Sequence, residues 1–200
     1  VITSDPAQPN GAVGKPNINT PTNLGLDGLS IPGPVAAIAK AITGAYLSSG
    51  GNAFTTRTAN QIVQEHFNPQ ERFSPSGPLF GVQFSQLPCS DLNINTNTVT
   101  IGPKRSPLGL AADPGGLPLY KNGDMVGGVG VISDGAYSVD LRISDFDTDN
   151  DELIALAATR GFEPPADIVG NRITVEGKTF RFTDRGSRSL LSSAAAAPSF

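Results

Sequence analysis

A glycine-rich segment, residues 115–131, constrains the fold of this chain more than any other part of the sequence. Residues 117–120 are typical of a strand, residues 121–124 of a turn, and residues 125–132 of a returning strand. The dipeptide Asn122-Gly123 in the turn favours a two-residue hairpin loop, because both residues tolerate positive φ angles. The sequence therefore predicts an antiparallel β-hairpin at this place.

The returning strand has one face almost without side chains. Side chains alternate along a strand, so Gly128 and Gly130 share one face while Val129 and Val131 share the other. A strand face that lacks Cβ atoms allows another body to approach closely. Three bodies fit this description: a helix, a neighbouring subunit or a flat ligand.

Three segments carry helical signals. From Pro34 to Tyr46, apolar residues recur at spacings of three and four, which indicates a helix with one apolar stripe. A second helix is predicted from about residue 59 to 67, with Thr55, Thr56 or Thr58 as its N-cap. A third is predicted over residues 149–160. Its Asp149 and Glu152 form the pattern of a capping box, and Gly161 follows its end.

The remaining segments are shorter or irregular. Prolines at positions 6, 9, 16, 21 and 32 exclude a helix in residues 1–34, which are predicted to form an extended arm or long surface loop. Short strands are predicted at residues 79–84 and 99–101, a closing hairpin at 172–183 and a flexible tail at 184–200. We therefore expect one α/β domain over residues 35–183, an antiparallel sheet with helices packed on it.

Composition excludes several function classes. The formal net charge is −4 and the only dense basic pair is Lys104-Arg105, whereas binding to nucleic acid needs a clustered basic face. The single cysteine, Cys89, excludes an internal disulfide and a multi-cysteine metal site. It is interpreted as a small buried residue, with a reactive thiol or soft metal ligand as the alternative. No run approaches the roughly 20 apolar residues of a membrane span.

Localisation is predicted from surface chemistry. Lys and Glu are few, while Asn, Ser, Thr, Gly and Pro are abundant. Such a composition favours a periplasmic or extracellular protein. No basic start followed by an apolar core is present, so the chain is expected to be a mature or trimmed product.

The order of these motifs resembles the GlcG/HbpS family of small haem-binding α/β domains, which also occurs as the C-terminal domain of corrinoid adenosyltransferase-type proteins. The similarity covers roughly residues 26–162. It implies an α/β sandwich that binds haem or a related tetrapyrrole and forms an oligomer. The residues that carry it are Lys40, Ala41, Thr43, Thr56, Gly115, Gly116, Pro118, Leu119, Gly123, Val126, Gly127, Gly128, Gly130 and Val131, with residues 149–158 as the acid-capped helix.

Two departures from the family pattern affect the prediction. The family's first helix and two strands have no counterpart before Asp27-Gly28, and residues 67–109 form an insertion. Without the first strands, a sheet edge and an apolar face would stay uncovered. We therefore expect an N-terminal fragment, a second subunit or another copy of the chain to complete the sheet.

The resemblance also implies a set of haem-binding residues. His66 is the only histidine and hence the candidate axial metal ligand, although a lone histidine is often structural. Thr55 and Thr56 are alternative ligands, with Cys89 as a further one. Arg57 or Lys40 would pair with the haem propionates, and the Gly128 and Gly130 face would receive the ring. The Cys-x-x-Cys-His signature of covalent haem is absent.

Other chemistry is less well supported. Alternating acids from Asp145 to Asp151 begin like a calcium loop, but Asn150 and Leu156 replace its glycine and final glutamate, so the acids are interpreted as favouring a helix N-terminus. A catalytic role would rest on Lys40 with Thr43 or Asp27. The sequence therefore predicts a non-enzymatic haem-binding module that assembles into an oligomer. The alternatives are a structural assembly subunit without ligand, and an enzyme or accessory protein of glycolate-type metabolism.

Overall fold

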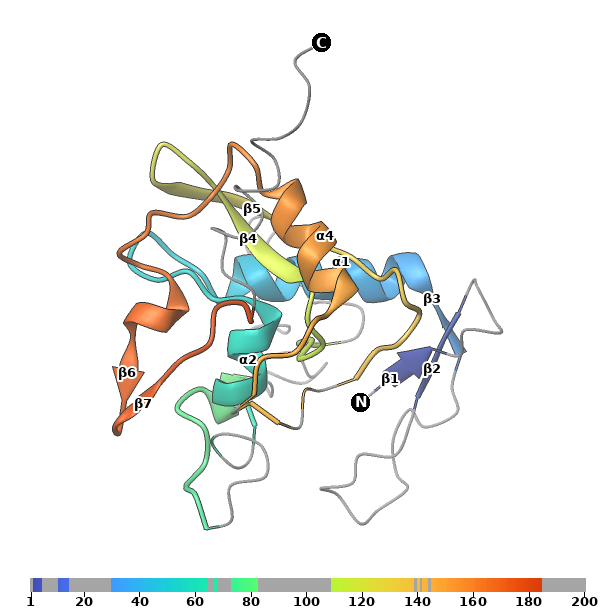
Figure 1. The fold of residues 1–200 in the computed structure, drawn as a ribbon, viewed down its shortest axis with the longest axis horizontal. Coiled ribbons are helices and arrows are strands. Elements are labelled where there is room, and N and C mark those ends of the chain that lie inside the picture. The colour runs from blue at the N-terminus through green and yellow to red at the C-terminus, as the bar shows by residue number, and fades with distance from the viewer. Residues whose placement is uncertain are drawn as a thin grey trace, which may run out of the picture.

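The computed structural model describes residues 2–4, 11–14, 30–64, 67, 73–82, 109–138, 140, 142, 143 and 145–184. These residues form a mixed α/β fold with small antiparallel sheets, as the sequence predicts (Figure 1). Its centre is a hairpin of strands β4 (Gly116–Lys121) and β5 (Asp124–Gly130) with helix α1 (Gly33–Tyr46) packed on it. None of the described helices is long and apolar enough to cross a bilayer.

The β4–β5 hairpin is confirmed with its predicted turn. Asn122 and Gly123 have φ angles of 55° and 91°, which is the left-handed backbone that this turn requires. The strands pair antiparallel, with Gly116 opposite Gly130 and Leu117 opposite Val129. One irregularity interrupts the register between Leu119 and Tyr120, so the regular ladder runs from there to the open end of the hairpin.

Helix α1 is the body that approaches the glycine face. A Cβ atom at Gly128 would overlap the carbonyl oxygen of Ala41, and one at Gly130 would overlap that of Ala37. The same close approach continues over β4, because a Cβ atom at Gly44 of the helix would lie 2.9 Å from the carbonyl carbon of Leu117. Of the three partners that the sequence allows for this face, the structure thus shows a helix.

Helix α2 (Thr56–Ile62) begins and ends earlier than predicted. Thr55 is its N-cap: the Thr55 side chain accepts a hydrogen bond from the Thr58 N–H, and the Thr58 side chain accepts one from the Thr55 N–H. Residues 77–79 provide donors for carbonyl groups at the end of the helix and just after it. The N–H of Leu79 donates to the Ile62 carbonyl at 2.9 Å, and that of Gly77 donates to the Gln64 carbonyl at 3.0 Å.

The largest apolar cluster lies between α2 and the C-terminal hairpin. Phe180 meets Phe54 and Phe67 edge to face, with ring centroids 5.7 and 5.9 Å apart. Leu47, Ala59, Ile62 and Val63 complete the cluster. The hairpin itself, β6 (Thr174–Val175) and β7 (Lys178–Thr179), is confirmed but shorter than predicted. A short 3-10 turn, η2 (Gly170–Arg172), precedes it.

Helix α4 (Asn150–Ala158) confirms the third predicted helix and contacts both central strands. Asp149 is its N-cap, accepting from the Glu152 N–H at 2.8 Å. The predicted reciprocal half of the capping box is not formed, because the Glu152 carboxylate turns away from the cap to Arg57. Gly161 follows the helix with a φ of 80°.

The ends of the chain depart from the predictions. Within residues 1–34, strands β1 (Ile2–Ser4), β2 (Gly11–Gly14) and β3 (Ser30–Pro32) form a small antiparallel sheet near the start of α1 (Figure 1). Residues 79–82 form a turn and a 3-10 segment, so the strand predicted there is wrong. Asp184, assigned to the tail, is buried. The predictions for His66, Cys89, residues 99–101 and residues 185–200 lie outside the described residues.

Candidate functional site

Lys40 of α1 is fully buried, and its ammonium group lies between two aspartates. Its Nζ donates to Asp151 Oδ2 at 2.6 Å and to the Pro114 carbonyl at 2.8 Å, and it pairs with Asp113 Oδ2. The other oxygen of Asp151 accepts from the Ser133 N–H and hydroxyl, each at 2.6 Å. Two hydrogens of the ammonium group thus have acceptors inside the protein, and Asp113 adds a second carboxylate as an ion pair.

Two carboxylates around one ammonium leave this cluster with one excess negative charge. Burial raises the pKa of Asp113 to about 7, although Lys40 opposes this shift. Burial also raises the pKa of Tyr137, whose buried hydroxyl has no hydrogen-bond partner among the described residues. A proton on Asp113 would leave a neutral pair of Lys40 and Asp151, which costs less to bury than three charges.

This cluster predicts a pH dependence of stability. The folded chain binds a proton at Asp113 with a pKa of about 7, whereas the unfolded chain binds it at about 3.9. Folding therefore takes up a proton between these values, and Asp113 alone should raise the free energy of unfolding by about 2.6 kcal/mol from pH 8 to pH 5. Urea denaturation at both pH values measures it. Asp113→Asn should reduce this rise and leave only the part due to other carboxylates of raised pKa such as Asp184, and an unchanged slope in that variant would contradict the assignment.

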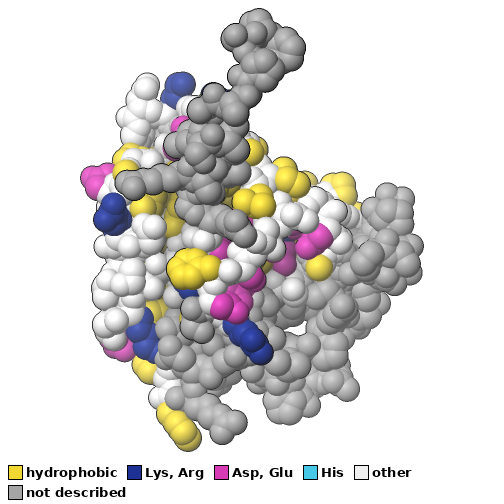
Figure 2. Space-filling model, in the orientation of Figure 1, with side chains coloured by type: hydrophobic (Ala, Val, Ile, Leu, Met, Phe, Trp, Pro, Cys, Tyr) yellow, Lys and Arg dark blue, Asp and Glu magenta, His cyan; other side chains and the backbone are white. Residues whose placement is uncertain are grey.

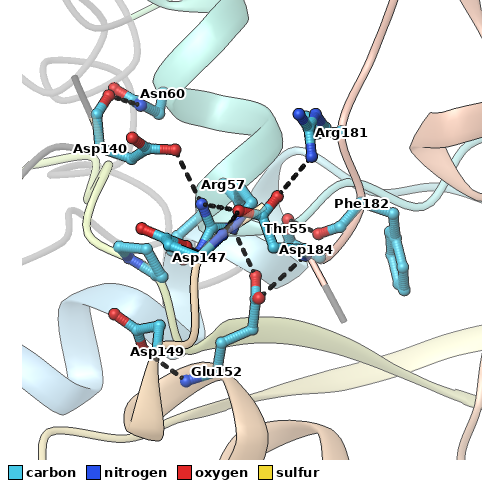
Figure 3. Close-up of polar contacts among 12 residues, drawn as sticks. Thr55, Arg57, Asn60, Asp140, Asp147, Asp149, Glu152, Arg181, Phe182 and Asp184 are labelled. Atoms are coloured by element: carbon cyan, nitrogen blue, oxygen red, sulfur yellow. Dashed lines mark hydrogen bonds and ion pairs between the residues drawn. The ribbon is translucent and has the colours of Figure 1, made fainter. Parts of the chain in front are cut away.

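Arg57 is the centre of a second buried cluster, in which carboxylates from three parts of the chain converge on its guanidinium (Figure 3). Nε donates to Glu152 Oε1 at 2.7 Å. Nη1 lies 2.8 Å from Asp140 Oδ2 and 3.0 Å from Asp184 Oδ2, and Nη2 lies 3.2 Å from Asp147 Oδ1. Arg57 thereby ties α2 to α4, to residues 140–149 and to the segment that ends at Asp184.

The charges of this second cluster are strongly coupled. Burial lowers the pKa of Arg57, but the nearby carboxylates of Glu152, Asp184 and Asp147 raise it by more than burial lowers it. The guanidinium therefore stays charged. Burial raises the pKa of Asp184 to about 6 against the effect of Arg57, and it also raises the pKa of Glu152. Arg181 supports the arrangement by donating to Asp184 Oδ1 at 2.7 Å.

The two threonines predicted as alternative ligands hold the backbone together. Thr55 Oγ1 donates to the Phe182 carbonyl at 2.6 Å, and Thr56 Oγ1 accepts from the Gly116 N–H at 3.0 Å. Lys40 and Arg57 are already neutralised by carboxylates. The structure therefore brings Lys40, Thr55, Thr56 and Arg57 together in the core as ties between segments. Together with the covered Gly128 and Gly130 face, these residues do not fit a haem.

A cleft of about 370 Å³ opens beside the two clusters. Acidic side chains gather across the middle of the face drawn in Figure 2. Three carboxylates, Asp140, Asp147 and Asp184, bring ligand atoms within 4.8 Å of one another, a spacing that suits a metal ion. Arg57 already contacts all three and supplies their positive charge. The residues that line the cleft are Asp113, Pro114, Asp134, Ala136, Ser138, Asp140, Arg142, Asp145, Asp147 and Asp149.

Sequence reasoning found the two cations of these clusters but missed their partners. The acids from Asp145 to Asp151 are interpreted from the sequence as favouring a helix N-terminus, which holds for Asp149, the N-cap of α4, and for Asp151 in its first turn. Asp113 and Asp184 carried no signal. A buried arginine within an apolar and threonine-rich helix does imply several nearby carboxylates, but the sequence does not show which ones.

Comparisons with protein-family models, with curated proteins and with solved structures find no match to this chain.

Proposed function

We propose that this chain is a non-enzymatic module that assembles into an oligomer through the free edge of β5. The observation that carries the proposal is the pairing of the central hairpin: among the described residues, β5 pairs with β4 on one side and with no strand on the other. An unpaired strand edge offers N–H and C=O groups that favour pairing with a further strand. The GlcG/HbpS-like sandwich is part of this proposal, with the added strand widening the sheet.

Two further observations support a role in assembly. Val126 of β5 is 56% exposed and Ile38 of α1 is 49% exposed, which is much for large apolar side chains in the central layers of a fold. Lys40, on which the catalytic alternative depends, is engaged in a buried ion pair, and so is Arg57. Their position suits the stability of the module rather than turnover of a substrate.

Sedimentation velocity of the purified chain tests the proposal. The monomer has a mass of 20.6 kDa, and we expect a larger species whose fraction grows with concentration. Val126→Lys should reduce that fraction, because a charge beside the edge must lose water on assembly. Phe73→Ser, at a fully exposed position outside the hairpin, is the matched control. A chain that stays monomeric, or an oligomer that Val126→Lys leaves unchanged, contradicts the proposal.

The second candidate function is haem or tetrapyrrole binding by the assembled module. The exposure of the apolar side chains of Ile38 and Val126 favours it, since a haem slot needs exposed apolar side chains. Because the described candidates are engaged in the core, His66 is the first remaining candidate axial ligand, with Cys89 as the second. Titration with haemin should produce a Soret band that shifts in His66→Ala. If no Soret band appears, haem binding is wrong and assembly is the one proposed function that remains.

A further inference from the structure

The backbone of β5 offers two residues to a further strand. The N–H of Val131 donates to the Gly115 carbonyl at 3.0 Å, so this pair is hydrogen-bonded. In an antiparallel ladder such pairs alternate with pairs whose N–H and C=O groups point outward. Gly116 and Gly130, and then Pro118 and Gly128, are pairs of the second kind. The N–H and C=O groups of Gly128 and Gly130 therefore point away from β4.

The flank of α1 extends over this edge. Gly128 and Gly130 of β5 lie against the backbone of Ala41 and Ala37, whereas Gly116 of β4 lies against the backbone of Lys40. Ala37 and Ala41 therefore lie over β5, and Lys40 lies over β4. With about 3.6 residues per turn, the side of α1 beyond Ala37 and Ala41 carries Ile38 and Ile42. These apolar residues, which we call the α1 flank, overhang the place where a strand beside β5 would lie.

Neither the edge nor the α1 flank carries the features that protect exposed strands. Residues 125–132 contain no charged residue and no proline, and the α1 flank has no charge either. Natural edge strands are commonly blunted by lysine, proline or bulges. The one irregularity in this hairpin lies towards its turn and leaves residues 127–130 in a regular ladder. The edge is therefore suited to pairing.

The edge is also self-complementary. We propose that two copies of this chain pair β5 with β5 in an antiparallel manner, around a two-fold axis at Val129. Gly128 of each copy then faces Gly130 of the other. Each of these two pairs exchanges two backbone hydrogen bonds, which gives four in all. This inference rests on the proposed assembly function. It adds that the strand pairing with the edge of β5 is β5 of a second copy of the chain.

The spacing of helices and strands fits this arrangement. Neighbouring strands lie about 4.8 Å apart, and α1 lies over the line between β4 and β5. The two-fold axis would place the two α1 helices side by side on one face of a four-stranded sheet, two strand spacings apart. That is about 10 Å, the distance at which helices pack. Ile38 of one copy would then pack against the α1 flank of the other.

The interface is small. The face of each copy is about 20 Å long and about 15 Å deep, the depth of one helix layer and one sheet layer together. The two faces together bury on the order of 600 Å². Stable interfaces bury about 1,200 Å² or more. The dimer should therefore be weak and depend on concentration.

Cysteine cross-linking tests the register. In a Cys89→Ser background, which removes the only native cysteine, Val129→Cys should form a disulfide dimer under mild oxidation. Residue 129 meets itself across the axis as a pair without backbone hydrogen bonds, with Cα atoms about 4.5 Å apart, which suits a disulfide. Gly127→Cys and Val131→Cys alone should each form no disulfide dimer, but a mixture of the two should cross-link, because residue 127 faces residue 131 of the second copy.

The outcomes separate this inference from the proposed function. If Val129→Cys links no faster than the other two variants while sedimentation still shows an oligomer, the two-fold pairing is wrong and the assembly function stands. If the chain is monomeric throughout, both are wrong. Hydrogen exchange of the unmodified chain is a second measurement that does not depend on the variants. The amides of Gly128 and Gly130 should become protected as the concentration rises, and constant exchange overturns the pairing.

Discussion

Replacing Arg57 with methionine should lower the free energy of unfolding by about 4 kcal/mol. The substitution removes the guanidinium but leaves Asp140, Glu152 and Asp184 buried, and an uncompensated buried charge typically costs about 3–5 kcal/mol. Those carboxylates would take up protons, so the loss should be smaller at pH 5 than at pH 8. Urea denaturation followed by circular dichroism measures both effects.

Two variants control this experiment. Arg160→Met removes an exposed arginine just after α4 and should change the free energy of unfolding by less than about 0.5 kcal/mol. Arg57→Lys keeps the charge but cannot span three carboxylates with a planar fork, so its loss should be intermediate. Equal losses in Arg57→Met and Arg160→Met would show that the second cluster does not hold the fold together.

Adding one methyl group at Gly130 should lower the free energy of unfolding by about 3 kcal/mol, the upper range for overpacking a core. The new Cβ would overlap the carbonyl oxygen of Ala37 and approach the backbone nitrogen of Ala41 to 2.6 Å, and neither atom can move without shifting α1. Thermal unfolding of Gly130→Ala measures the loss.

Gly127 is the matched control on the same strand. A Cβ atom there would meet nothing within 4 Å, and its side chain would point to the face opposite α1. Gly127→Ala should be neutral or stabilise by up to about 1 kcal/mol, because it reduces the entropy of the unfolded chain. If both alanine variants unfold alike, α1 does not pack on the glycine face as the structure has it.

These predictions separate what supports the module from what it offers to a partner. Lys40 and Arg57 connect α1 and α2 with segments far along the chain, so their loss should affect stability and not any ligand. Ile38 and Val126 contribute little to the core, so changing them should affect assembly with little change in stability. Measuring unfolding and sedimentation on the same variants therefore tests the two roles independently.

Local chemistry allowed the sequence to determine the hairpin and the helices. Asn122 and Gly123 adopt positive φ at low cost, Pro34 suits a first helical turn, and Asp149 caps α4, so each element follows from residues within a few positions of it. The start of α2 was ambiguous because three threonines compete as N-cap. Only the contact with the segment ending at Phe182 gives Thr55 a buried acceptor.

The partners of the buried charges were decided by the tertiary structure alone. Lys40 and Asp151 lie 111 positions apart, and Arg57 and Glu152 lie 95 apart. No local pattern links such residues, because an ion pair depends on which segments pack together and how much water that packing removes. The glycine face shows the same division: the sequence determined that something must approach Gly128 and Gly130, and only the packing of the fold made that partner α1.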